Sequence, residues 1–204
     1  LRKELEAKNI KFHTSHSDSE VVLKGLEYYG KKFISKLRGQ FSIFYVDKRK
    51  RNILLARDRV GQKPLYYHIS NNTLVFGSNL IAVSKLVKNK TISQGSINEY
   101  LMNGVISSPD TIFENIKKLK PSELIEISYE NNLKKKDNEL FWDISSFVDS
   151  KPFQNDEFFS ILSDAISVRN SADVPIANFL SGGLDSTSII KNTTNFNTNI
   201  NTFN

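Results

Sequence analysis

A glycine-rich segment near the carboxyl end carries the clearest chemistry in this sequence. It reads Ser181-Gly182-Gly183-Leu184-Asp185-Ser186 and lies between an expected strand, Val174–Leu180, and an expected helix, Thr187–Lys191. Two glycines let a ligand approach the backbone closely, and successive N–H groups at a helix start form an anion-binding nest. The hydroxyls of Ser181 and Ser186 add donors, and Asp185 can hold a magnesium ion that bridges phosphate oxygens. The segment predicts a phosphate cradle, with a simple tight turn as the alternative.

The same segment excludes one large class of phosphate-binding proteins. No lysine follows the glycines in the Gly-x-x-x-x-Gly-Lys-Ser/Thr pattern, so this is not the loop of a kinase or GTPase.

Charged side chains at the ends of expected elements are the second group of candidates. Asp18, in Ser17-Asp18-Ser19-Glu20, precedes an apolar helical pattern. Its carboxylate can either pair with a substrate ammonium or cap the helix, and spacing alone does not separate the two roles. Arg57 and Asp58 end an expected strand, and we expect a structural ion pair that braces this end rather than a catalytic pair.

Composition excludes several functional classes. The 204 residues contain no cysteine, which rules out a disulfide scaffold, thiolate metal ligation and a cysteine nucleophile within them. Three scattered histidines make a histidine-rich metal site improbable. No apolar run approaches the roughly 18 residues of a membrane span, and the first residues do not form a signal peptide. We therefore expect a soluble, cytoplasmic protein with no membrane partner.

Positive charge is concentrated in the first third of the chain. Residues 1–63 carry 16 basic and 7 acidic side chains, with the densest cluster at Lys48-Arg49-Lys50-Arg51. Nucleic acid binding is one interpretation of such a cluster. A charged hairpin tip between two apolar strands is favoured, because neither aromatic stacking residues nor a reading helix accompany the charge.

The elements that would position these residues follow from hydrophobic spacing and turn formers. A helix is expected over Asp18–Leu37, capped by Ser17 or Ser19 and followed by Gly39, and a second over Leu80–Val87. A third is expected to start with the capping box Ser96-x-x-Glu99 and to stop at Gly104. Consecutive antiparallel strands are expected at Phe41–Val46, Ile53–Arg57, Pro64–Ile69 and Thr73–Phe76, and a further strand at Leu124–Ser128 precedes a polar hairpin at Asn131–Asn138.

The carboxyl-terminal part predicts a second domain. A linker, Pro152–Asn155, precedes an amphipathic helix that starts at Asp156 and is expected to bury Phe158, Phe159, Leu162, Ala165 and Ile166. We place one domain at residues 1–150 and another at 151–204. Leu1 is not methionine, and Asn192–Asn204 holds ten Asn or Thr residues, which suits either a disordered tail or a polar loop leading into a strand at Ile200–Phe203. We therefore expect a fragment.

Several motifs together resemble one protein family. Ser181–Ser186 resembles the pyrophosphate loop of the ATP pyrophosphatases, and Ala56–Tyr67, with Arg57-Asp58-Arg59, resembles a segment of class II glutamine amidotransferases. The combination of the two resembles glutamine-hydrolysing asparagine synthetase. Four shorter motifs between them add to this resemblance: Thr111-Ile112-Phe113, Leu119-x-Pro121, Phe141-Trp142 and Asp173-Val174-Pro175. Ser122 and Ala177 depart from this pattern, because glycine is usual at both positions.

The resemblance implies a fold and an activity. The fold would be a partial α+β domain of the amino-terminal-nucleophile hydrolase type, followed by the start of an α/β ATP-pyrophosphatase domain. The intact enzyme would hydrolyse glutamine and convert aspartate to asparagine through β-aspartyl-AMP, with ATP and Mg²⁺ and without nucleic acid, and could form a homodimer. Its nucleophile would precede residue 1, so this chain would hold no catalytic residue and be inactive alone. Asp18 would bind glutamine, Asp185 the metal, and the ATP-binding set would be Leu180, Ser181, Gly182, Gly183, Leu184, Asp185 and Ser186.

Two other functions stay open from the sequence. One is a related amide synthetase of antibiotic or surface-polysaccharide pathways that acts on another carboxylate; β-lactam synthetase, for example, lacks the catalytic cysteine. The other is a non-enzymatic binding module that uses the basic Lys48–Lys63 face, which salt-sensitive retention on polyanions would reveal.

Overall fold

The computed structural model describes residues 1–204 except 71, 131, 149–151, 171, 173 and 197–199. The chain divides into two compact units, Leu1–Phe147 and Val148–Asn204. The boundary predicted after residue 150 and the motif residue Asp173 both lie outside the described residues. Each unit is considered by itself below.

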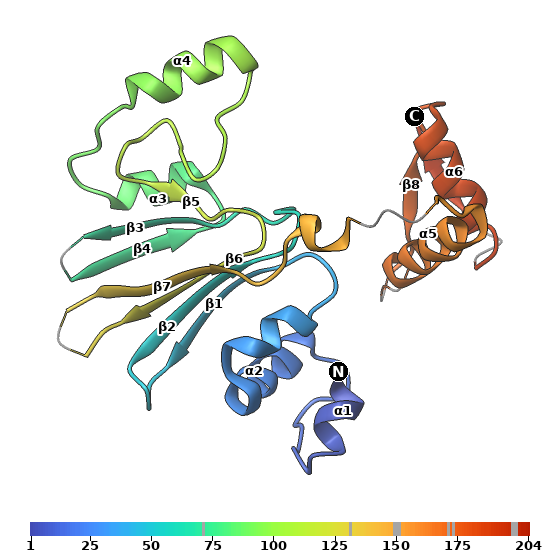
Figure 1. The fold of residues 1–204 in the computed structure, drawn as a ribbon, viewed down its shortest axis with the longest axis horizontal. Helices are drawn as coiled ribbons and strands as arrows, with labels where there is room; N and C mark the ends of the chain where they lie inside the picture. Colours follow the sequence, from blue (N-terminus) through green and yellow to red (C-terminus); the bar gives the residue numbers. More distant parts are fainter. Residues whose placement is uncertain (71, 131, 149–151, 171, 173, 197–199) are drawn as a thin grey trace. The chain divides into compact units, whose positions relative to one another are not determined.

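A four-stranded antiparallel sheet forms the centre of the first unit (Figure 1). Its strands follow the spatial order β1-β2-β6-β7, with β1 at Ser42–Asp47, β2 at Asn52–Arg57, β6 at Glu123–Ser128 and β7 at Lys134–Leu140. Strand β2 is buried on both faces, which explains its unbroken apolar sequence. Within the predicted polar hairpin at Asn131–Asn138, Asn131 lies outside the described residues, and Lys134–Asn138 belong to the edge strand β7, whose lysines suit an exposed edge.

A second, three-stranded antiparallel sheet has the order β4-β3-β5. Its strands are β3 at Tyr66–Ser70, β4 at Thr73–Gly77 and β5 at Lys117–Lys118. The four strands predicted between residues 41 and 76 are present, but they form two hairpins in two different sheets. Strand β2 pairs with β6 rather than with β3, because the Arg57–Pro64 turn carries the chain from one sheet to the other.

The apolar side chains sort into three cores that define four layers. Leu54, Ala56 and Leu124 face a core shared with the amino-terminal helices. Their strand neighbours Ile53 and Leu55 point to the opposite side and pack between the two sheets, as the two-residue period of a strand requires. A third core of Val83, Val87 and Ile116 joins the second sheet to helix α3, Leu80–Leu86. The layers are therefore helix, sheet, sheet, helix.

The amino-terminal helical layer contains α1 at Arg2–Glu6, α2 at Asp18–Tyr29 and a 3₁₀ helix, η1, at Gly30–Lys36. The single helix predicted over Asp18–Leu37 is wrong in its second half. Gly30 has a φ of 63°, a left-handed conformation that ends α2 and lets the chain turn before η1. The turn brings Phe33 of η1 onto Gly25 of α2, where only a glycine leaves room for the ring.

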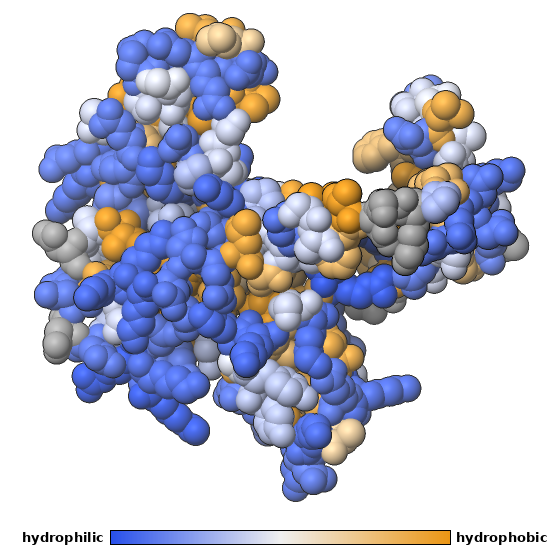
Figure 2. All heavy atoms as spheres, in the orientation of Figure 1, coloured by the Kyte–Doolittle hydropathy of each residue, from blue (hydrophilic) through white to orange (hydrophobic). Residues whose placement is uncertain are grey.

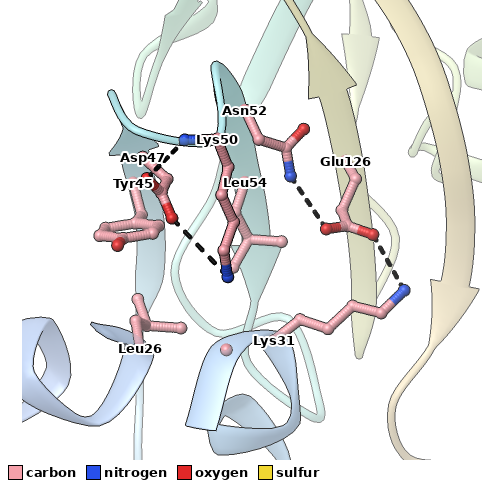
Figure 3. Close-up of a pocket in the computed structure, with 9 residues that line it drawn as sticks. Leu26, Lys31, Tyr45, Asp47, Lys50, Asn52, Leu54 and Glu126 are labelled. Carbon is pink, nitrogen blue, oxygen red and sulfur yellow. Dashed lines mark hydrogen bonds and ion pairs between the residues drawn. The ribbon is translucent and has the colours of Figure 1, made fainter. Parts of the chain in front are cut away.

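An ion-pair network fastens this layer to the central sheet (Figure 3). The Nζ of Lys31 lies 2.9 Å from Glu126 of β6 and 3.3 Å from Glu139 of β7. Glu126 also accepts a hydrogen bond from the Asn52 side chain at 3.0 Å. These groups raise the pKa of Lys31, the hydrogen bond to Glu126 being the largest cause. The network borders a small cavity of about 60 Å³. Its ion pairs hold η1 at strands β6 and β7.

Helix α4, Gln94–Asn103, lies beyond the second sheet. Ser93 caps it by accepting a hydrogen bond from the Ser96 N–H, so the predicted capping box starting at Ser96 is wrong; the predicted stop at Gly104 is confirmed. Glu99 bonds the Ser107 N–H instead of a helix-start N–H. Figure 2 shows apolar side chains on the surface over α4. Leu101 and Met102 of this helix are exposed.

The first unit ends with a short 3₁₀ helix, η2, at Ile144–Phe147, and the second contains two helices and two short parallel strands. Helix α5 covers Asn155–Arg169, β8 covers Ala177–Phe179, α6 covers Leu184–Thr193 and β9 covers Asn201–Phe203. The strand predicted over Val174–Leu180 is thus shorter, and the helix predicted from Thr187 starts earlier. Of the predicted buried side of α5 only Ile166 is buried, while Phe158 and Phe159 are exposed. Strand β9 agrees with the strand alternative for the Asn/Thr-rich segment.

Candidate functional site

Asp18 is the first residue of α2, and its side chain is exposed. The helix cap is Ser17, whose Oγ accepts a hydrogen bond from the Glu20 N–H at 3.2 Å. The capping alternative for Asp18 is therefore wrong. Its carboxylate accepts no hydrogen bond from any residue that the structure describes, so it is available to a cation.

Two adjoining cavities meet at Asp18. One of about 530 Å³ lies between α2 and β1, and one of about 400 Å³ lies between the start of α2 and the Leu37–Phe41 segment. Both are lined by Asp18, Val22, Gln40 and Phe41. Polar groups from Gln40, Ser42 and Lys63 border the larger cavity, whose remaining walls are mostly apolar. The arrangement gives a small polar molecule a carboxylate, neutral donors and a cation on one surface.

Arg57 and Asp58 shape the turn that places Lys63 beside this cavity. The Arg57 guanidinium donates to the carbonyl oxygens of Lys63 at 2.8 Å, Leu119 at 2.6 Å and Gly61. The Asp58 carboxylate accepts from the Gln62 and Lys63 N–H groups, both at 2.9 Å. Arg57 and Asp58 thus brace the end of the strand, as predicted. They do so through hydrogen bonds to the backbone rather than through the predicted ion pair with each other. Burial lowers the pKa of Arg57, and the charge of Asp58 opposes this shift.

The sequence did not indicate the role of Glu20, a side chain close to Asp18. The Glu20 carboxylate accepts hydrogen bonds from the His13 N–H at 2.7 Å, the Thr14 N–H at 2.9 Å and the Thr14 hydroxyl at 2.6 Å. These bonds lower the pKa of Glu20 to about 2, and the bond from the His13 N–H is the largest cause. The spacing Ser17-x-x-Glu20 is that of a capping box, but it predicts a bond from the Ser17 N–H to Glu20, and the Ser17 N–H donates to the Thr14 hydroxyl instead.

The predicted phosphate cradle forms the turn between β8 and α6. Gly182 has a φ of 77°, in the left-handed region, and Gly183 is the residue that precedes the first turn of α6. Ser181 and Ser186 come together, with their Oγ atoms 3.1 Å apart. Leu180 donates its N–H to the Phe203 carbonyl at 2.7 Å and so belongs to the pairing of β8 with β9. Ser181, both glycines, Leu184 and Asp185 are exposed.

The turn has the features that a phosphate group needs. No described side chain caps the start of α6, so its first N–H groups are available to an anion. A Cβ on Gly182 would meet no heavy atom within 4 Å, which leaves open space beside the backbone. Asp185 lies in the first turn, and the described residues contain no cluster of three acidic, histidine or cysteine side chains for a metal. A single carboxylate suits Mg²⁺ that is held mainly by phosphate oxygens and water.

The basic cluster at Lys48–Arg51 forms the tip of the β1–β2 hairpin, as favoured from the sequence. Asp47 accepts hydrogen bonds from the Arg49 and Lys50 N–H groups, both at 3.0 Å, and so shapes the turn. None of the helices in the described part of the chain has the length and apolar character needed to cross a bilayer.

Comparison with known proteins gives two family matches in the expected order. Residues 1–142 match the family described as glutamine amidotransferase domain, and residues 157–204 match the family described as asparagine synthase. The predicted fold class is confirmed by these matches.

Among curated relatives, asparagine synthetase [glutamine-hydrolyzing] 1 of Bacillus subtilis is 30% identical over 100% of this chain and 32% of its own length. Putative asparagine synthetase [glutamine-hydrolyzing] 2 of Methanocaldococcus jannaschii is 31% identical over 85% of this chain and 34% of its own length. Amidase chry2 of Gibberella zeae is 29% identical over 85% of this chain and 26% of its own length.

The chain therefore spans about a third or less of the length of these relatives. Because the first family match covers well over half of the chain, the protein belongs to the glutamine amidotransferase family, and its amidotransferase domain, of the amino-terminal-nucleophile hydrolase type, is followed by the start of an asparagine synthase domain.

Proposed function

We propose that the protein containing this chain is a cytoplasmic, ATP-dependent, glutamine-hydrolysing enzyme that converts aspartate to asparagine through β-aspartyl-AMP. The observation that carries the proposal is the order of the two parts. An amidotransferase unit with an open carboxylate at Asp18 precedes a strand–turn–helix whose turn has the geometry of a phosphate cradle. The first part supplies nitrogen from glutamine and the second activates the acceptor carboxylate.

Asp18 would recognise glutamine by its α-amino group. The carboxylate is exposed, makes no bond within the described protein, and lies where the two cavities meet. A charged hydrogen bond between carboxylate and ammonium is stronger than a neutral one, and it distinguishes an amino acid from a simple amide. The nucleophile that attacks the side-chain amide is a cysteine outside these residues in this proposal, because the chain contains none.

The Leu180–Ser186 segment would hold MgATP. ATP supplies the adenylyl group that turns a poor acyl donor into a good one. The chain would contribute the N–H groups at the start of α6, the hydroxyls of Ser181 and Ser186, and the Asp185 carboxylate as one ligand of Mg²⁺. Gly182 would keep the backbone open to the phosphates, since its left-handed φ excludes most side chains.

A related amide synthetase that acts on another carboxylate is the second candidate. It is favoured by the similarity to amidase chry2, which is nearly as identical to this chain as the asparagine synthetases are. Both candidates share glutamine and ATP as substrates and differ in the acceptor acid. Assaying the full-length enzyme with aspartate and with other carboxylates, by release of pyrophosphate, separates them; pyrophosphate release that requires aspartate supports the first.

Two conservative substitutions in the full-length enzyme test whether glutamine use depends on the first part and ATP-dependent synthesis on the second. Asp18→Asn should impair glutamine-dependent synthesis while sparing synthesis from free ammonia. Asp185→Asn should abolish ATP-dependent synthesis while leaving glutamine hydrolysis largely intact. Asp156→Asn is the matched control for the latter, because Asp156 is also an exposed first-turn aspartate, in α5. Equal loss of both activities in either variant would contradict its assigned role.

A further inference from the structure

The segment that leads into α2 is held from two sides. On one side the Glu20 carboxylate binds the backbone of His13 and Thr14 and the Thr14 hydroxyl. On the other side the Arg2 guanidinium donates to the carbonyls of Thr14 at 2.6 Å and Ser17 at 3.2 Å. The same guanidinium lies 4.2 Å from the centroid of the Phe12 ring. A loop of exposed polar residues is therefore fixed by two charged side chains.

Thr14 closes this arrangement into a ring of hydrogen bonds. Its hydroxyl donates to Glu20 at 2.6 Å and accepts from the Ser17 N–H at 3.3 Å. Ser17 in turn accepts from the Glu20 N–H at 3.2 Å. The ring runs from Glu20 through Thr14 to Ser17 and back to Glu20. It fixes the backbone on both sides of Asp18, which follows Ser17 directly and is separated from Glu20 only by Ser19.

Asp18 has no other means of being oriented within the described protein. Its carboxylate bonds to no described group, so its direction depends on the backbone from which it projects. A short side chain on a fixed helix start occupies few positions, whereas the same side chain on a frayed start occupies many. Holding a binding group in one place reduces the ordering cost that its ligand must otherwise meet.

The Glu20 contacts are of the strong kind. A glutamate is ionised at neutral pH, and the hydrogen bonds to the Glu20 carboxylate lower its pKa further, to about 2. Hydrogen bonds to an ionised acceptor are stronger than neutral ones. A helix cap alone needs only the Ser17 hydroxyl, which is already present. The additional bonds to residues 13 and 14 fix the loop rather than the helix.

We propose that Glu20, acting through Thr14, is a positioning residue for Asp18 and thereby sets the affinity of the amidotransferase unit for glutamine. The inference rests on the proposed function of Asp18 and extends it to residues that do not touch the substrate.

The first test measures steady-state kinetics of the full-length enzyme with glutamine and with ammonia. Glu20→Gln removes the charge and one acceptor, and we expect KM for glutamine to rise about tenfold, near the lower end of the effect of a hydrogen bond to a charged group. Synthesis from ammonia should be unchanged. Thr14→Val should raise KM in the same way, while Thr14→Ser, which keeps the hydroxyl, should restore it. Glu27→Gln is the control, because Glu27 is on the same helix but pairs only with Lys24 among the described residues, at 3.4 Å.

A double-mutant comparison separates positioning from general stabilisation. If Glu20 acts through Asp18, Glu20→Gln should change KM for glutamine little in an Asp18→Asn background, because the group that it positions is already lost. An undiminished effect in that background, or equal KM values for Thr14→Val and Thr14→Ser, would overturn the proposal. If Asp18→Asn itself leaves KM unchanged, the proposed function of Asp18 fails instead, so the two failures are distinguishable.

Discussion

Replacing Gly25 by alanine tests the packing that holds α2, and with it Asp18, against η1. A Cβ on Gly25 would lie 2.2, 2.3 and 2.4 Å from three ring carbons of Phe33. The Phe33 side chain is fully buried, and the Tyr29 ring stacks parallel to it at a centroid distance of 6.1 Å. The ring therefore cannot move aside without displacing its neighbours.

The magnitude follows from two opposing effects. Alanine is favoured over glycine inside a helix by about 1 kcal/mol. Forcing an extra methyl group into a packed core costs about 1–3 kcal/mol, and contacts this short place Gly25→Ala at the upper end. We expect a net loss of about 2 kcal/mol in the free energy of unfolding. Gly95→Ala in α4 is the matched control, because its Cβ would meet only the Ser93 Oγ, at 3.8 Å. This variant should gain up to about 1 kcal/mol.

Urea unfolding followed by tryptophan fluorescence measures both variants. Trp142 is the single tryptophan of the chain and lies in the first unit, so its signal reports on the unit that contains Gly25. The opposite signs of the two Gly→Ala effects are the decisive feature. If Gly25→Ala is as stable as the unmodified chain, α2 does not pack on Phe33 in this way.

Three further predictions use the same chain. Arg57→Lys should lower the free energy of unfolding by about 2 kcal/mol, because lysine cannot reach the three carbonyls that the guanidinium bonds; an unchanged urea midpoint would contradict this. The purified 204-residue chain should release no ammonia from glutamine, since it has no thiol nucleophile, and measurable hydrolysis would refute that. The stabilising effect of Glu20 should be complete above pH 4.5 and should disappear as pH falls towards 2, because folding lowers its pKa. Acid unfolding of Glu20→Gln should therefore be less steep in this range, and superimposable curves would argue against the Glu20 contacts.

Local elements could largely be predicted from the sequence, because short-range chemistry decides them. Turn formers separate the strands at Asp47–Asn52 and Ser70–Asn72, and the four strands predicted between residues 41 and 76 agree with the observed ones to within two residues. The start of α2 at Ser17 and the stop of α4 at Gly104 follow from capping preferences. The glycine turn before α6 was likewise predicted from its own residues.

The errors in the predicted elements occurred where a second cap residue or a tertiary contact outweighed the local sequence signal. Ser93 and Ser96 both offer a cap for α4, and the structure uses Ser93 although Ser96 has the capping-box spacing. The apolar period of Asp18–Leu37 continues through Gly30, but the backbone turns there so that Phe33 can pack on α2. The charged segment Lys134–Leu140 has no apolar alternation, and it forms a strand because β6 offers it a partner.

By itself the sequence determined the existence and approximate limits of most elements, the absence of a thiol nucleophile in the chain, and the residue types of the phosphate turn. The tertiary structure alone decided that β2 pairs with β6, about seventy residues away, and that consecutive hairpins belong to separate sheets. It also decided that Ser17, rather than Asp18, caps α2, and that Glu20 reaches back to Thr14. Caps and turns depend on a few neighbouring residues, whereas strand pairing and side-chain partners depend on which surfaces meet when the whole chain buries its apolar groups.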